Sequence, residues 1–316
     1  MTAIGRTVAA FTAMPGNARG VVWMILAALF YALTYAVVRY LSGNFSTFQI
    51  VFFRSLLGLI FMTPWAIQAG LSGLRTTRMT LYTGRTVLNY FGMVTLMYGI
   101  AMLPLQDVTA LMFTSPLFTV LFVALILGEQ VGLRRWSALL VGFAGALVII
   151  RPGFAEVGLP ALGILFTAAA YALVNTANKS LARTDESNKI VFYMFALMVV
   201  AGIGPALYVW VMPTLEDLPW ILAMGAFSAL ATQCVVRALA VGEAGAVMPF
   251  NFLKLPFAVV LGFTFWSEFP DYWTAIGALV IFGSTYYIAR REAALKRVTA
   301  GTETTAPPPG TIPPGT

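Results

Sequence analysis

Histidine is absent from this chain, and cysteine occurs only once, at Cys234. A lone cysteine excludes an intrachain disulfide. The missing histidine removes the commonest metal ligand and the commonest general base of enzymes. Only 10% of the residues are charged, against about 25% in soluble domains. There is also no phosphate-binding loop and no nucleophile elbow. We therefore expect no enzymatic activity, no bound metal and no cofactor.

Apolar residues are what the chain has in abundance, at 59% of its 316 residues. A helix needs about 20 largely apolar residues to cross a bilayer. Ten such runs are present, joined by short connections, which predicts an all-α polytopic membrane protein with ten transmembrane helices. The expected spans are roughly 20–42, 46–68, 80–102, 106–127, 134–151, 160–182, 188–211, 217–240, 244–267 and 270–289.

The basic residues fall mostly in alternate connections, so the net charge of +7 reflects orientation in a bilayer better than nucleic-acid binding. The positive-inside rule then predicts that both termini are cytoplasmic. We expect the protein in the inner membrane. Residues 1–19 form a cytoplasmic segment. The tail at 298–316 is rich in Pro, Thr and Gly, which predicts disorder.

The span at 244–267 is unusual because it carries polar groups where lipid would surround a simple helix. Lys254 lies near its middle, with Asn251 about one turn earlier and prolines at Pro249 and Pro256. A lysine at this depth costs at least ~2.5 kcal/mol unless it faces protein or water. Each proline also frees a backbone carbonyl. The segment is therefore predicted to be irregular and to border a binding site.

The fourth and ninth spans share one order of landmarks: a proline, a small residue followed by glutamate, and then a tryptophan. The landmarks are Pro116, Glu129 and Trp136 in the first half and Pro256, Glu268 and Trp273 in the second. An odd repeat of five spans must insert upside down. We predict two inverted five-helix repeats, over 20–151 and 160–292, with a site at their interface. The two glutamates are interpreted as turn and interface features, not as proton carriers.

Together with the ten spans, this pattern resembles the EamA-type branch of the drug/metabolite transporter superfamily. The motif residues are Pro116, Leu117, Phe118, Leu127, Gly128, Glu129, Arg134, Arg135, Trp136, Gly142, Arg151, Pro152 and Gly153. The resemblance implies a basket of inverted repeats around a central cavity, lined mainly by helices 1, 3, 4, 6, 8 and 9, without ATP-binding parts. Its members move amino acids, nucleosides, riboflavin, S-adenosylmethionine, sugars and drugs.

Polar residues within the spans are the candidates for binding a substrate. They are Lys254, Asn251, Asn89, Arg85, Gln233, Asn175, Tyr171, Thr114, Tyr35 and Arg54. Structural alternatives stay open for several of them: Arg54 and Arg85 could snorkel, Gln233 could bond across helices, and Thr114 could bond its own helix.

The spans hold basic side chains but no acidic residue well inside them. This pattern favours a secondary transporter that works by alternating access on a small polar metabolite, either an amino acid or another carboxylate-bearing solute. The alternative is a vitamin or cofactor uptake permease of the riboflavin or S-adenosylmethionine type. A non-transporting membrane assembly protein is a remote alternative. The expected partners are a small-molecule substrate and the lipid bilayer, with the chain either a monomer or a homodimer.

Overall fold

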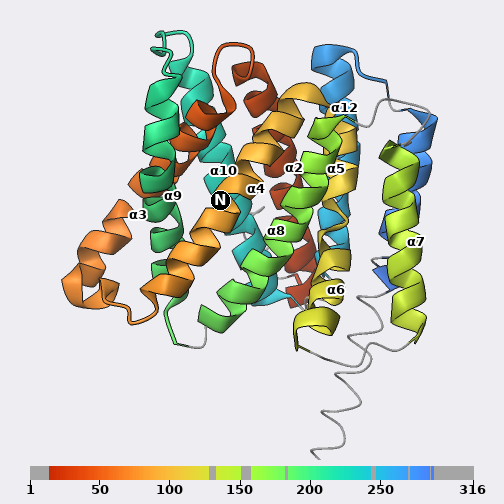
Figure 1. Cartoon of the computed structure of the whole chain (residues 1–316), viewed down its shortest axis with the longest axis horizontal. Coiled ribbons are helices and arrows are strands. Elements are labelled where there is room, and N and C mark those ends of the chain that lie inside the picture. The colour runs from red at the N-terminus through yellow and green to blue at the C-terminus, as the bar shows by residue number, and fades with distance from the viewer. Residues whose placement is uncertain are drawn as a thin grey trace, which may run out of the picture.

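A computed structural model describes residues 14–127, 133–150, 158–181, 184–242, 247–269, 271–284 and 286–287. All regular elements in these residues are helices, which stand side by side as a bundle (Figure 1). Their bounds are α2 Gly16–Leu41, α3 Thr47–Leu74, α4 Met79–Met102, α5 Leu105–Met112, α6 Ser115–Leu127, α7 Leu133–Ile150, α8 Leu159–Leu181, α9 Ser187–Tyr208, α10 Leu218–Val241, the 3₁₀ helix η1 Met248–Leu253, α12 Lys254–Trp266 and a last helix at Tyr272–Ser284.

The predicted fold class is confirmed, because helices occupy all ten expected span positions within the described residues. Six of these helices are long and apolar enough to cross a membrane, and three more are shorter and apolar. Of the expected terminal segment at 1–19, residues 1–13 lie outside the described residues, whereas residues 16–19 already belong to α2. The tail at 298–316 and Glu129 also lie outside the described residues. The chain is thus a multi-pass membrane protein.

The main departure from the predicted spans is in the fourth, which is broken rather than continuous. α5 ends at Met112 and α6 begins at Ser115, with a turn at Phe113 and Thr114 between them. Pro116 accounts for the break, since it cannot donate to the Met112 carbonyl four residues earlier. A smaller departure is in α3, which runs to Leu74 and changes direction at Gly70 (φ 64°), a backbone conformation that favours glycine.

The ninth span is broken at the corresponding place, as its prolines predict. The 3₁₀ helix η1 gives way to the α-helix α12 at Lys254, two residues before Pro256. The two breaks face each other, since the rings of Phe113 and Phe252 meet edge to face with centroids 4.5 Å apart. Both interrupted helices therefore cross near the middle of the bundle.

Helix packing follows the symmetry expected of inverted repeats. α2 packs on α10, and its counterpart pair α4 and α8 packs likewise. α3 packs on α9, and α5 packs on α12. If each span of the first half is exchanged with the span five places later, this set of contacts stays the same. That is the pattern of a pseudo-two-fold axis in the membrane plane. The described helices thus form one scaffold from two equivalent halves.

Polar side chains fix the connections at both ends of the bundle. At one end, which we call the Arg78 end, Arg78 donates to the Ser180 carbonyl (2.9 Å), and Tyr82 donates to Asp185 (3.1 Å). At the opposite end, the Arg39 end, Asn44 donates to Asp217 (3.1 Å). Hydrogen bonds from the Thr214 backbone and hydroxyl, then from Asn44, hold the pKa of the Asp217 carboxyl below its ordinary value.

The fifth and tenth spans approach each other closely at two glycines. A Cβ on Gly277 would lie 2.5 Å from the Gly145 carbonyl oxygen, and one on Gly145 would lie 2.9 Å from the Gly277 oxygen. Real side chains do not reach such distances, so the two backbones can meet only because both residues lack a side chain.

Replacing Gly277 with leucine should therefore force these helices apart and destabilise the protein by about 1–3 kcal/mol. The measurement is the melting temperature of the purified protein in detergent. Gly283→Leu is the matched control, because a Cβ at Gly283 meets nothing within 4 Å. Equal melting temperatures for the two variants would contradict the close approach.

Candidate functional site

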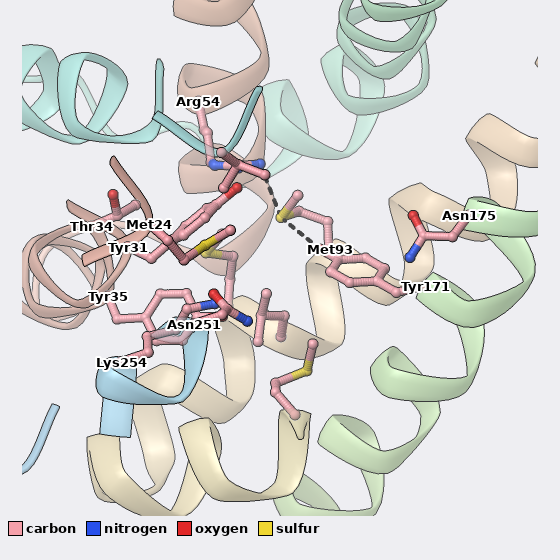
Figure 2. A pocket seen from close by; sticks show the side chains of 14 residues that line it. Met24, Tyr31, Thr34, Tyr35, Arg54, Met93, Tyr171, Asn175, Asn251 and Lys254 are labelled. Carbon is pink, nitrogen blue, oxygen red and sulfur yellow. Dashed lines mark hydrogen bonds between the residues drawn. The ribbon is translucent and has the colours of Figure 1, made fainter. Parts of the chain in front are cut away.

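A cavity of about 400 Å³ lies inside the bundle, beside the breaks of the fourth and ninth spans (Figure 2). This volume lies within the range of small-molecule binding sites. The residues that line it come from both halves of the chain. They are Met24, Tyr31, Thr34, Tyr35, Arg54, Met93, Leu96, Met97, Met112, Tyr171, Asn175, Val235, Asn251 and Lys254.

Lys254 enters the cavity because it is the first residue of α12, directly after the 3₁₀ segment. Its ammonium lies over the ring of Tyr31, 4.4 Å from the centroid. Such a cation–π contact stabilises the charge by about 2 kcal/mol or more when water is excluded. Asn251, three residues earlier, lines the same cavity and adds an amide with both donor and acceptor groups.

Arg54 enters the cavity from α3, at a distance from Lys254 in the view of Figure 2. Its Nη1 donates to the sulfur of Met93 (3.3 Å), and the hydroxyl of Tyr171 also approaches that sulfur (3.6 Å). A thioether is a weak acceptor. The guanidinium is therefore held by a partner that a carbonyl, carboxylate or phosphate oxygen would readily replace.

The remaining lining is aromatic and sulfur-rich. Tyr35 is buried on α2, and Thr34 beside it donates to the Phe30 carbonyl (2.8 Å). Four methionines complete much of the wall: Met24, Met93, Met97 and Met112. Among the described lining residues two are cationic and none is acidic. The cavity thus offers flat apolar surfaces together with hydrogen-bond donors.

Six of the ten residues proposed from the sequence line this cavity: Lys254, Asn251, Asn175, Tyr171, Tyr35 and Arg54. Arg85 does not. It is buried between helices, bonded to Asn178 and to the Ile190 carbonyl (3.2 Å), with its guanidinium over the ring of Tyr82. Its contacts tie α4 to α8 and α9.

The other three proposed residues also lie outside the lining. Asn89 is buried and donates to the sulfur of Met198 on α9 (3.0 Å). Thr114 bonds the Leu111 carbonyl (2.7 Å) at the helix break. Gln233 is exposed, and Val235 on α10 lines the cavity instead. Two residues along an α-helix turn by about 200°, so the faces of Gln233 and Val235 are nearly opposite.

Sequence reasoning missed the apolar part of the lining, above all its methionines. A partial signal was present on α4, where Met93 and Met97 are four residues apart and so share one side of the helix. The contribution of α3 also differs from the expectation, because the family resemblance implied a cavity lined mainly by helices 1, 3, 4, 6, 8 and 9. Arg54 adds the second span to that set.

A sequence model of the EamA-like transporter family matches this chain twice, over residues 18–151 and 158–290. The chain belongs to the EamA-like transporter family. The resemblance inferred from the sequence is thereby confirmed. The two matched segments together cover most of the chain, and they contain all the residues that line the cavity.

Named members of the EamA-like family resemble the chain along most of their length. A "Riboflavin transporter" of Rhizobium johnstonii is 30% identical over 276 residues, which cover 86% of this chain and 91% of the relative. An "S-adenosylmethionine uptake transporter" of Rickettsia prowazekii is 25% identical over 273 residues (86% and 93%). A "Pseudopaline exporter CntI" of Pseudomonas aeruginosa is 30% identical over 273 residues (86% and 96%).

A solved crystal structure shares the EamA fold, with a TM-score of 0.58 over 87% of this chain and 98% of the solved one, at 19% sequence identity. At that identity the likeness concerns the fold alone. Its family makes the chain a membrane transporter of a small metabolite, and the nature of the metabolite has to be argued from the cavity.

Loss of the charge at Arg85 and loss of the charge at Lys254 should affect the stability of the protein to different extents. Arg85→Gln removes buried contacts between three helices, which should cost about 1–3 kcal/mol of stability for each partner that is left unpaired. Lys254→Gln loses the contact with Tyr31 but also removes the cost of burying a charge, so it should change ligand affinity with less loss of stability. Melting temperatures of the two ligand-free variants test this, and a lower value for Lys254→Gln than for Arg85→Gln would contradict it.

Proposed function

We propose that this protein is a secondary transporter that takes up a flat, acceptor-rich heterocycle of the riboflavin type. The observation that carries the proposal is the lining of the cavity. Tyrosine rings and thioethers supply flat, polarizable surfaces, and Arg54, Lys254 and two asparagines supply donors. An isoalloxazine ring presents a planar apolar face and several carbonyl and ring-nitrogen acceptors, which match that set.

The signs of the charges separate this substrate class from two others. S-adenosylmethionine carries a sulfonium and an ammonium group, and among the described lining residues none is an acid that would pair with them. An amino acid would use the cations for its carboxylate but would leave its ammonium unpaired and the aromatic wall unused. Buried unpaired charges are costly. The vitamin or cofactor reading therefore replaces the amino acid as the favoured one.

Orientation follows from the basic loops. Arg75 and Arg78 precede α4, and Lys189 lies in the first turn of α9, all at the Arg78 end of the bundle. The positive-inside rule makes this the cytoplasmic face of the inner membrane, with both termini on that side. The Arg39 end then faces outward. Transport proceeds by alternating access, as the two repeats rock around the cavity between them.

Uptake into proteoliposomes tests the substrate directly. Purified protein is reconstituted and labelled riboflavin is supplied outside, with S-adenosylmethionine, flavin mononucleotide and a neutral amino acid as competitors. We expect riboflavin accumulation that only the flavins inhibit. Riboflavin uptake no higher than the background, together with uptake of labelled S-adenosylmethionine by the same proteoliposomes, would favour the cofactor alternative and overturn the proposal. Protein-free liposomes give the background.

Arg54 provides a sharper test of the binding mode. Arg54→Gln removes a charged donor from the cavity, and a charge-assisted hydrogen bond is worth about 1.5–3 kcal/mol. We expect the KM for riboflavin to rise about tenfold or more. Arg237→Gln is the matched control, because Arg237 is exposed and stacks over Trp23 (5.0 Å) outside the described lining. Equal KM values for both variants would contradict a contact with Arg54.

A further inference from the structure

An ion pair at the Arg39 end links three segments that lie far apart in the sequence. Nη2 of Arg39 lies 2.6 Å from Oε1 of Glu268, and both side chains are largely buried, at 18% and 10% exposure. Arg39 is near the end of α2, and Glu268 follows α12. The third segment is the connection between α4 and α5, which both side chains bind.

Arg39 and Glu268 bind the two helix ends that meet at this connection. Nη1 of Arg39 donates to the carbonyls of Ile100 (3.3 Å) and Leu103 at the end of α4. Oε2 of Glu268 accepts from the backbone N–H of Leu105, the first residue of α5 (3.0 Å). A cation is thus placed at a helix C-terminus and an anion at a helix N-terminus, where the backbone dipoles favour each.

The backbone after α12 turns so that Glu268 packs against the end of that helix. Ser267 adopts a left-handed conformation (φ 54°), and the Glu268 N–H returns to the Gly262 carbonyl (3.1 Å). A Cβ at Gly262 would lie 2.8 Å from Oε2 of Glu268, so the carboxylate occupies space that only glycine leaves open. Non-glycine residues in this conformation are uncommon, and local strain of this kind often marks functional sites.

The ion pair lies one helical turn beyond the cavity on both helices that it joins. Arg39 follows Tyr35 by four residues on α2, and Ile100 follows Leu96 by four on α4. Residues at this spacing share one face of a helix, and both Tyr35 and Leu96 line the cavity. The pair therefore closes the layer between the cavity and the Arg39 end. The Arg39 guanidinium also lies over the ring of Trp266, 5.6 Å from its centroid, so this ring is part of the same closed layer.

The helix contacts made at the two ends of the bundle are not equivalent, although the two repeats are related by symmetry. α2 packs against α4, and the symmetry-related pair is α8 and α10. That second pair makes at most marginal contact in the described residues. Asn175 on α8 lines the cavity and is nevertheless exposed. In a transporter built from inverted repeats, contacts made at one end and missing at the other identify the closed side.

We propose that Arg39 and Glu268 form the gate of this transporter at the Arg39 end, and that the cavity opens toward the Arg78 end. Separation of the pair detaches α2 from the α4–α5 connection and from the end of α12, so it accompanies opening of the cavity at the Arg39 end and its closure at the Arg78 end. The gate requires only that the protein transports by alternating access. It holds for riboflavin or for any other cargo.

Accessibility of one cysteine tests the gate without any substrate. Met97→Cys places a thiol in the cavity lining, in a background where the native Cys234 is replaced by alanine. A membrane-impermeant maleimide is applied to sealed vesicles of each orientation. We expect rapid labelling from the Arg78 end and slow labelling from the Arg39 end. Equal or faster labelling from the Arg39 end would overturn the proposal.

Glu268→Gln should then raise the labelling rate from the Arg39 end about fivefold or more, the range of typical conformational coupling. The rate from the Arg78 end should not rise, because the equilibrium moves between two states. An unchanged rate at the Arg39 end, or a rise at both ends through general loosening, contradicts the gate. Arg39→Gln provides a second, independent variant, and the double variant should exceed neither single one if the two residues act as a unit.

A control at the same end separates gating from loss of any nearby bond. The Thr274 hydroxyl donates to Asp107 (2.7 Å), which joins the last helix to α5 without involving α2. Thr274→Val should leave the labelling rate from the Arg39 end unchanged. A rise equal to that of Glu268→Gln would assign the effect to local disruption and overturn the assignment to Arg39 and Glu268.

Discussion

Water is absent from the middle of a bilayer, so every backbone group there needs a partner within the protein. This constraint explains why the fold is all helix and why its two breaks lie where they do. Pro116 and Pro256 each deny a hydrogen bond to the preceding turn. The interrupted backbone is tolerated because the two breaks face each other inside the bundle, with Phe113 against Phe252 (4.5 Å). The cavity forms beside that crossing.

The symmetry of the scaffold does not extend to its chemistry. When the spans are aligned on the two prolines, Thr114 of the first half corresponds to Lys254 of the second. The threonine bonds its own helix through the Leu111 carbonyl (2.7 Å), whereas the lysine lies over Tyr31 (4.4 Å). The two corresponding positions therefore differ in role: Thr114 completes hydrogen bonding at its own break, and Lys254 places a positive charge in the cavity.

Composition and apolar runs were enough to predict the helical membrane fold, and the membrane cost of a buried lysine was enough to single out Lys254 and Asn251. The break in the fourth span was not predicted, because one proline in an apolar run is also compatible with a kinked continuous helix. Gln233 and Asn89 were misplaced since spacing shows which residues share a face but not which neighbour that face meets. The methionines of the cavity lining were not predicted, because an apolar residue in a membrane span can face lipid, the protein core or a cavity equally well.

The methionines of the cavity lining suggest how one fold can be used by relatives that transport different compounds. Met93 and Met97 line the cavity, and a thioether side chain has three rotatable bonds and no fixed shape. Such a surface adapts its contour to a ligand without any movement of the helices behind it. Discrimination is then left to a small number of rigid polar positions, so a change of cargo during evolution requires few substitutions and no new architecture.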